Sequence, residues 1–278
     1  MGQPPKRRSC IQISQRISRR RTRALHRTPT ALCAVVAGEF LSRYTWEFKV
    51  SSVTNRSIYA VDVGSTRPNR NSNRAFAWAS VGRTPIERGV RCSSDIDLLA
   101  NEIERDLLAG YSVALGFEAP LFIPVPTESE RLSHGRDGDR DRSWAAPAGS
   151  SVATLGFHQS AWLLRSLAER CSSNTSLLLD HRHWPPQGDS PVLFLWEAFV
   201  SGNAHDDDHR RDAASAVAYF LEHEANLSDK SACRAEDPIS LIGAAALWAG
   251  WSKDLSLLHA EVLVLKPHQA FEGELCSV

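Results

Sequence analysis

The chain has 278 residues, of which 42% are hydrophobic and 23% are charged. These proportions are ordinary for a globular protein and provide enough apolar material for the core of one large domain. The 32 Lys and Arg equal the 32 Asp and Glu in number, which excludes a chain that is strongly basic or acidic overall. No apolar run reaches the roughly 18 residues that a membrane-spanning helix needs, so no membrane span is predicted.

The charge is unevenly distributed along the chain. Residues 1–50 hold 11 of the basic residues but only two acidic ones, Glu39 and Glu47, which gives this segment a charge of +9. The remaining residues carry 21 basic and 30 acidic side chains, a charge of −9. The charge of the residues after position 50, called the body below, therefore gives no support for a nucleic-acid partner. The sequence does not indicate an oligomeric state.

Residues 1–52 have the composition of a basic leader, rich in Arg and Ser. Such a segment is typical of a targeting peptide or of a basic arm that binds nucleic acid. A second interpretation is that the start is misassigned, because Met1 is the only methionine and Val50 or Val53 could mark a non-ATG start. We expect residues 1–52 to be disordered or untranslated, and residues 53–278 to form a single domain.

The six cysteines are dispersed and include no CxxC pair, so they predict neither a structural zinc site nor a disulfide framework. Reduced thiols of this kind are typical of a cytoplasmic protein, which is the expected location.

The first predicted elements are two strands, a helix and a third strand. Residues 56–66 form an apolar run that ends in Gly-Ser-Thr, and residues 75–81 form a second strand, paired with the first as a wide hairpin. Residues 95–108 show the spacing of an amphipathic helix, with Gly110 as its stop signal. Residues 111–122 contain a short apolar run that ends in an acidic residue and a proline, as in a central strand that is covered on both faces.

The second half of the body predicts a long loop followed by helices and strands. In chain order these are a loop over 127–151, a helix over 152–170, a strand over 191–202, helices over 206–222 and 237–252, and a strand over 260–267. In the last helix, Asp237 is the expected N-cap and Pro238 the first helical residue. The pattern predicts an α/β fold, with a mixed sheet flanked by helices on both faces.

Three predicted strands each carry one acidic residue inside or directly after an apolar run: Asp62, Glu118 and Glu197. Burying a carboxylate is unfavourable by several kcal/mol unless it is paired, hydrogen-bonded or bound to metal. A shared Mg²⁺ or Mn²⁺ site would explain all three, because these ions prefer carboxylate oxygens. Asp212, on the helix expected over 206–222, is the predicted fourth ligand.

Each of these residues also has a purely structural interpretation. Asp62 could bond to the backbone of its own turn, Glu118 could end a strand before Ala-Pro, and Glu197 could face solvent on an edge strand. His205 and His209 are four residues apart, but no third ligand follows at a matching spacing. We therefore expect these two histidines to form a solvated surface pair.

A strand-borne Asp before Gly-Ser, a strand reading GFEAPLF and a helix containing Asp-Ala-Ala-x-Ala resemble the ribonuclease H-like superfamily, which includes Holliday-junction resolvases. The segments RSWAAPAGSS and LWEAF resemble a poorly characterised branch of it. The resemblance covers about residues 58–267. It implies that Asp62 and Glu118 bind metal, and that an acid on a late helix, Asp212 or Asp237, completes the site.

The function implied by this resemblance is divalent-metal-dependent nuclease activity, with Asp62, Glu118, Glu197 and Asp212 holding Mg²⁺ or Mn²⁺. One alternative is a ribonuclease H-like protein that has lost catalysis and serves as a binding or regulatory partner. Another is an actin-like or sugar-kinase-type phosphotransferase, because VDVGST resembles a phosphate loop of those proteins. The absence of a second D-x-G segment argues against it.

Overall fold

The computed structural model describes residues 56–67, 75–82, 89–139 and 143–278; the expected leader over residues 1–52 lies outside these ranges. The strands are β1 (Arg56–Asp62), β2 (Ala77–Val81), β3 (Val90–Ser93), β4 (Ser112–Glu118), β5 (Phe122–Pro124), β6 (Ser176–Leu178), β7 (Val192–Ala198), β8 (Pro238–Ser240), β9 (Val264–Leu265) and β10 (Leu275–Ser277). The helices are α1 (Ile96–Leu108), α2 (Pro147–Cys171), α3 (His209–His223) and α4 (Leu241–Ala249).

An eight-stranded mixed sheet has the order β10-β3-β2-β1-β4-β7-β6, and β9 pairs with β7. Strand β1 is antiparallel to β2, which confirms the predicted hairpin, and β1, β4 and β7 are parallel to one another. The carboxyl ends of these three strands therefore lie at one edge of the sheet. The general prediction of an α/β protein with a mixed sheet is confirmed.

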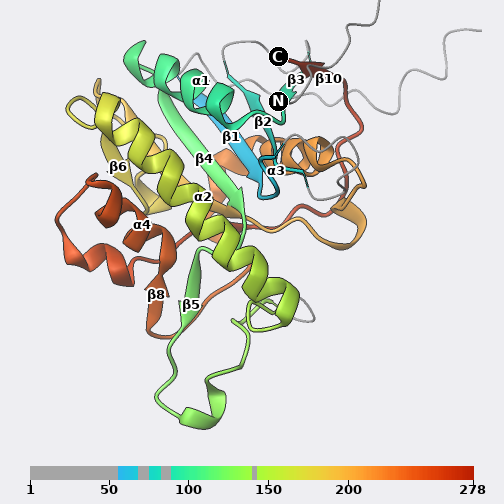
Figure 1. The fold of residues 1–278 in the computed structure, drawn as a ribbon, viewed down its shortest axis with the longest axis vertical. Helices are drawn as coiled ribbons and strands as arrows, with labels where there is room; N and C mark the ends of the chain where they lie inside the picture. Colours follow the sequence, from blue (N-terminus) through green and yellow to red (C-terminus); the bar gives the residue numbers. More distant parts are fainter. Residues whose placement is uncertain (1–55, 68–74, 83–88, 140–142) are drawn as a thin grey trace, which may run out of the picture. The chain divides into compact units, whose positions relative to one another are not determined.

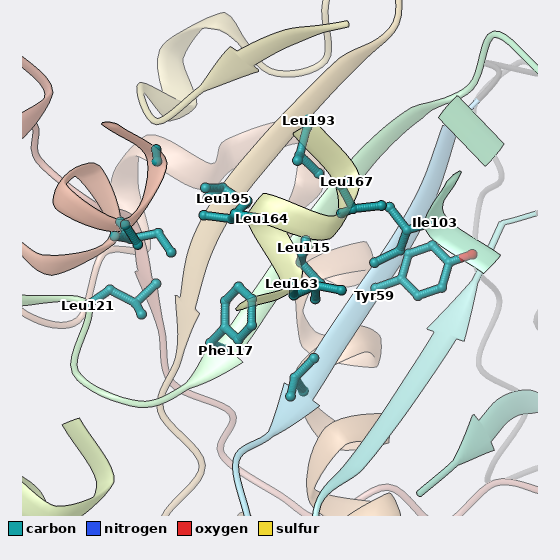
Figure 2. Close-up of a cluster of buried hydrophobic side chains, with 14 of the residues drawn as sticks. Tyr59, Ile103, Leu115, Phe117, Leu121, Leu163, Leu164, Leu167, Leu193 and Leu195 are labelled. Atoms are coloured by element: carbon teal, nitrogen blue, oxygen red, sulfur yellow. The ribbon is translucent and has the colours of Figure 1, made fainter. Parts of the chain in front are cut away.

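Side chains alternate between the two faces of the sheet and form two hydrophobic cores. Val61, Leu115 and Leu195 belong to the core on one face, together with side chains of α1, α2 and α4 (Figure 2). Phe194 and Trp196 belong to the core on the other face, against α3. Helices α1 and α2 thus cover the face opposite α3 (Figure 1), as the prediction of helices on both faces requires.

Helix α1 follows its prediction, but α2 begins earlier than expected. The Asp95 side chain accepts hydrogen bonds from two backbone N–H groups of the first turn, and Gly110 has a left-handed φ of 84° just beyond the helix. Helix α2 starts at Pro147 rather than at residue 152, because proline at the first helical position favours a helix start. Among the described helices, none is both long enough and apolar enough to cross a membrane.

The helix predicted over 237–252 is wrong in its first turn. Residues Pro238–Ser240 form β8, which pairs antiparallel with β5, and α4 begins only at Leu241. The N-cap is Ser240, whose hydroxyl accepts a hydrogen bond from the N–H of Gly243 at 3.0 Å. Asp237 has a φ of 43° and lies before β8, so it is neither an N-cap nor a helix acid.

Candidate metal site at the carboxyl end of the first strand

The candidate site joins the end of β1 to the start of α3. Asp62 is the last residue of β1, while His209 and Asp212 lie in the first turn of α3. The helix begins there because the Asp208 side chain caps it, accepting a hydrogen bond from the N–H of Arg210 at 3.0 Å. This start places His209 and Asp212 over the edge of the sheet where β1 ends.

Asp62, His209 and Asp212 each offer a ligand atom, and the three atoms lie within 4.8 Å of one another. The Nδ1 atom of His209 contacts the carboxylate of Asp62 directly. The Nδ1 atom of His205 lies 2.7 Å from Oδ2 of Asp212, and the N–H of Asp206 donates to Oδ1 of the same carboxylate at 2.8 Å. Both carboxylates are therefore held in fixed orientations.

Burial dominates the electrostatics of the two carboxylates. Asp62 is 7% exposed and Asp212 is 1% exposed. Desolvation raises the pKa of Asp62 above its ordinary value, although the hydrogen bond with His209 opposes the shift. Desolvation also raises the pKa of Asp212, and the neighbouring negative charge of Asp62 adds to that increase. A cation between the two carboxylates would relieve both effects.

The chemistry of this donor set fits a divalent cation. Two carboxylate oxygens are suited to Mg²⁺ and Mn²⁺, and an imidazole nitrogen shifts the preference toward Mn²⁺ or a later transition metal. Ligand atoms around one such ion are separated by at most about 4–5 Å, twice a metal–oxygen bond length. The ligand atoms of Asp62, His209 and Asp212 lie within 4.8 Å of one another, which agrees with this range.

Glu118 lies next to this group but is not a member of it. In the parallel pairing of β1 with β4, Glu118 is the Cα partner of Asp62. Residues in register on neighbouring strands point to the same face of a sheet, so both carboxylates lie on the side of α3. Glu118 therefore lies beside the group of Asp62, His209 and Asp212 without belonging to it.

The structure does not bring Glu197 to this site. Its Cα partner on β4 is Phe117, whose ring belongs to the core on the opposite face of the sheet from α3. Arg136 binds both carboxylate oxygens of Glu197, each at 2.7 Å, and the N–H of Leu121 donates to the same carboxylate at 2.9 Å. Glu197 is a buried ion-pair partner and does not complete the predicted set of four carboxylates.

The interpretation of His205 and His209 as a solvated surface pair is wrong for His209, whose side chain is 22% exposed and contacts a buried carboxylate, whereas His205 is exposed. His209 is paired with Asp62, a residue 147 positions away, and His205 with Asp212. The four-residue spacing of the histidines was visible in the sequence. The partner of His209, Asp62, could not be recognised from the sequence, because it lies on a distant strand and not in the local pattern around the histidines.

The arrangement can hold a divalent cation between two carboxylates and an imidazole, at the carboxyl edge where ligands of α/β sheets commonly bind. Of the acids named from the sequence, Asp62 and Asp212 meet there, Glu118 lies alongside, and Glu197 and Asp237 lie elsewhere. No protein-family model, curated protein or solved structure matches this chain.

Proposed function

We propose that this chain is a divalent-metal-dependent phosphodiesterase of the ribonuclease H-like type, with its active site at the carboxyl end of β1. The observation that carries the proposal is the approach of Asp62, His209 and Asp212 to within 4.8 Å through their ligand atoms. Two buried carboxylates held close together repel one another, so a cation between them would stabilise the arrangement.

The order of the acidic residues in the fold also favours this proposal. The resemblance to ribonuclease H-like proteins implies one ligand on the first strand, one on a neighbouring parallel strand and one on a late helix. Asp62 ends β1, Glu118 is its register partner on β4, and Asp212 lies on α3. The mixed sheet, with its hairpin and its parallel strands, agrees with the same fold.

The reaction would be hydrolysis, in which water forms a bond to phosphorus, the bond from phosphorus to the leaving oxygen breaks, and that oxygen takes up a proton. A bound divalent cation supplies positive charge to the phosphate oxygens. Asp62 and Asp212 would hold the cation, and His205 keeps Asp212 oriented through its 2.7 Å contact. The side chain of Gln159 donates to the carbonyl of Gly64 at 2.5 Å, which fixes the turn that follows Asp62.

Cleavage of end-labelled single-stranded and duplex DNA and RNA by the full chain, with Mn²⁺ or Mg²⁺, tests the proposal. We expect metal-dependent cleavage that falls by about 100-fold or more in Asp62→Asn and in Asp212→Asn. The matched control is Asp180→Asn, which removes a carboxylate of a surface ion pair with Arg182 and leaves cleavage unchanged. Equal cleavage by the wild-type chain and Asp62→Asn would contradict the proposed function.

A further inference from the structure

A pocket of about 410 Å³ opens beside Glu118. Its wall is formed by the carboxyl ends of β4 and β7, the segment that follows β7 and the first turn of α2. The volume is within the range of about 300–1,000 Å³ that small-molecule sites occupy. Because Glu118 is also the register partner of Asp62, the pocket adjoins the candidate metal site.

The wall of this pocket is mostly apolar, with carboxylates as its main charged groups. The apolar lining residues are Ala119, Pro120, Ala146, Ala148, Val152, Ala198, Phe199 and Val200. Among the lining residues the structure describes, Arg136 is the only cation, and Glu197 and Asp139 already bind it. A phosphate would meet the Glu118 carboxylate without a free cation in the wall, so the pocket disfavours phosphate. It favours a flat, apolar group with N–H donors.

One side of the wall brings an aromatic ring and a cation together. Phe199 lines the pocket, and the Nζ atom of Lys266 lies 4.3 Å from the centroid of its ring. Lys266 is not a lining residue itself, so its charge stands beside the pocket rather than inside it. Phe199 thus offers a ring on which a flat group in the pocket can stack, and Lys266 offers a positive charge that can bind a phosphate outside the pocket.

We infer that this pocket holds one unpaired, amino-bearing nucleobase of a single-stranded nucleic acid whose phosphate lies at the metal site; the inference rests on the proposed function. Nucleobases combine apolar faces with polar edges. Cytosine presents an amino group that can donate a hydrogen bond to the carboxylate of a glutamate. Single strands are the form in which such a base is free to leave its stack and enter a pocket.

Fluorescence anisotropy of the full chain in EDTA tests the inference without requiring cleavage. The probes are labelled oligo-dC, oligo-dT and an abasic strand of equal length. We expect oligo-dC to bind about 5- to 30-fold more tightly than the abasic strand, with oligo-dT between them. Ala148→Trp, which fills the pocket from an exposed position, should abolish these differences. Thr154→Trp, exposed on the same helix but not a lining residue, should retain them.

The outcomes separate this inference from the proposed function. Base-dependent binding that Ala148→Trp abolishes, in a chain that cleaves no diester with Mn²⁺, would support the pocket and contradict the nuclease. Metal-dependent cleavage combined with equal affinity for oligo-dC and the abasic strand would contradict base binding in the pocket and would still support the proposed nuclease activity. Failure of the full chain to bind any of the three strands would also overturn the inference. The same would follow if Thr154→Trp lost the differences in affinity between the strands as completely as Ala148→Trp does.

Discussion

Asp62 shows how a buried carboxylate at the candidate metal site affects the stability of the protein. Burial raises the pKa of this carboxyl from 3.8, so its charged form is disfavoured in the folded state. A raised pKa means that the carboxyl favours folding below about pH 3.8, and that this contribution is lost as the pH rises through the raised value. At pH values above this raised pKa, the ionised Asp62 therefore opposes folding.

Asp62→Asn should raise the melting temperature of the metal-free chain at pH 7, because a neutral amide removes the desolvated charge and keeps the shape. Each kcal/mol gained corresponds to about 2–4 °C for a domain of this size. Scanning calorimetry in EDTA measures the shift. Mn²⁺ should then stabilise the wild-type chain more than the variant. A lower melting temperature in Asp62→Asn would show that its pairing with His209 outweighs desolvation.

Metal affinity should decrease as the pH is lowered, starting above the ordinary titration range of aspartate. The pKa values of Asp62 and Asp212 are both raised, so protons compete with the cation at a higher pH than for exposed carboxyls. Mn²⁺ titrations between pH 5 and pH 8 measure this dependence. An affinity that is constant over that range would argue against these carboxyls as the ligands.

Glu197 has the opposite role, since its charge is compensated in the folded protein. Its side chain and that of Arg136 are each 2% exposed, and the two form a bidentate pair. Glu197→Gln should destabilise the chain by about 1–3 kcal/mol, because Arg136 loses its bidentate buried partner while its ion pair with Asp139 remains. Urea unfolding measures this change. Glu169→Gln, which breaks an exposed pair with Arg165, is the control and should change stability by less than about 0.5 kcal/mol.

At the scale of single elements, the long strands and helices were predictable and the faces of the strands were not. The apolar runs located β1, β4 and β7 and their terminal acids from local sequence alone. The local sequence around a carboxylate in an apolar run does not indicate to which face of the sheet its side chain points. The pairing of Phe117 with Glu197 places Glu197 away from α3, and that register is set by contacts between strands rather than by either strand.

Short elements escaped prediction because they carry too little periodicity. β5 and β8 have three residues each and exist through their pairing with one another. Helix α2 includes Gly149 despite the low helix propensity of glycine. A Cβ at this position would overlap the backbone of Ser143, just before the helix, so this close approach requires glycine.

Gly116, in the centre of β4, is required by the packing of the neighbouring strand. A Cβ at this position would overlap the indole ring of Trp196 on β7, which is fully buried. We expect Gly116→Ala to destabilise the chain by about 1–3 kcal/mol, as overpacking does. Gly188→Ala is the matched control, because no atom lies within 4 Å of a Cβ there. Denaturant unfolding of both variants compares them, and equal stability would contradict the packing argument.

At the scale of the whole molecule, the site depends on topology that no local pattern encodes. The parallel pairing of β1 with β4 brings Asp62 and Glu118 side by side, and the packing of α3 brings His209 to them from 147 residues away along the chain. The composition of the body, with its charge of −9, gives no general attraction for nucleic acid. A cation at this site would therefore strengthen the binding of a phosphodiester beyond what the contacts of a base supply.

Calorimetric titration of the metal-free full chain with Mn²⁺, at pH 7.5, tests the central claim most directly. The comparison includes the wild type, Asp62→Asn, Asp212→Asn and Asp180→Asn. The account predicts saturable binding to the wild type and to Asp180→Asn, and an affinity at least about tenfold lower in Asp62→Asn and in Asp212→Asn. Equal Mn²⁺ binding by the wild type and Asp62→Asn would contradict it.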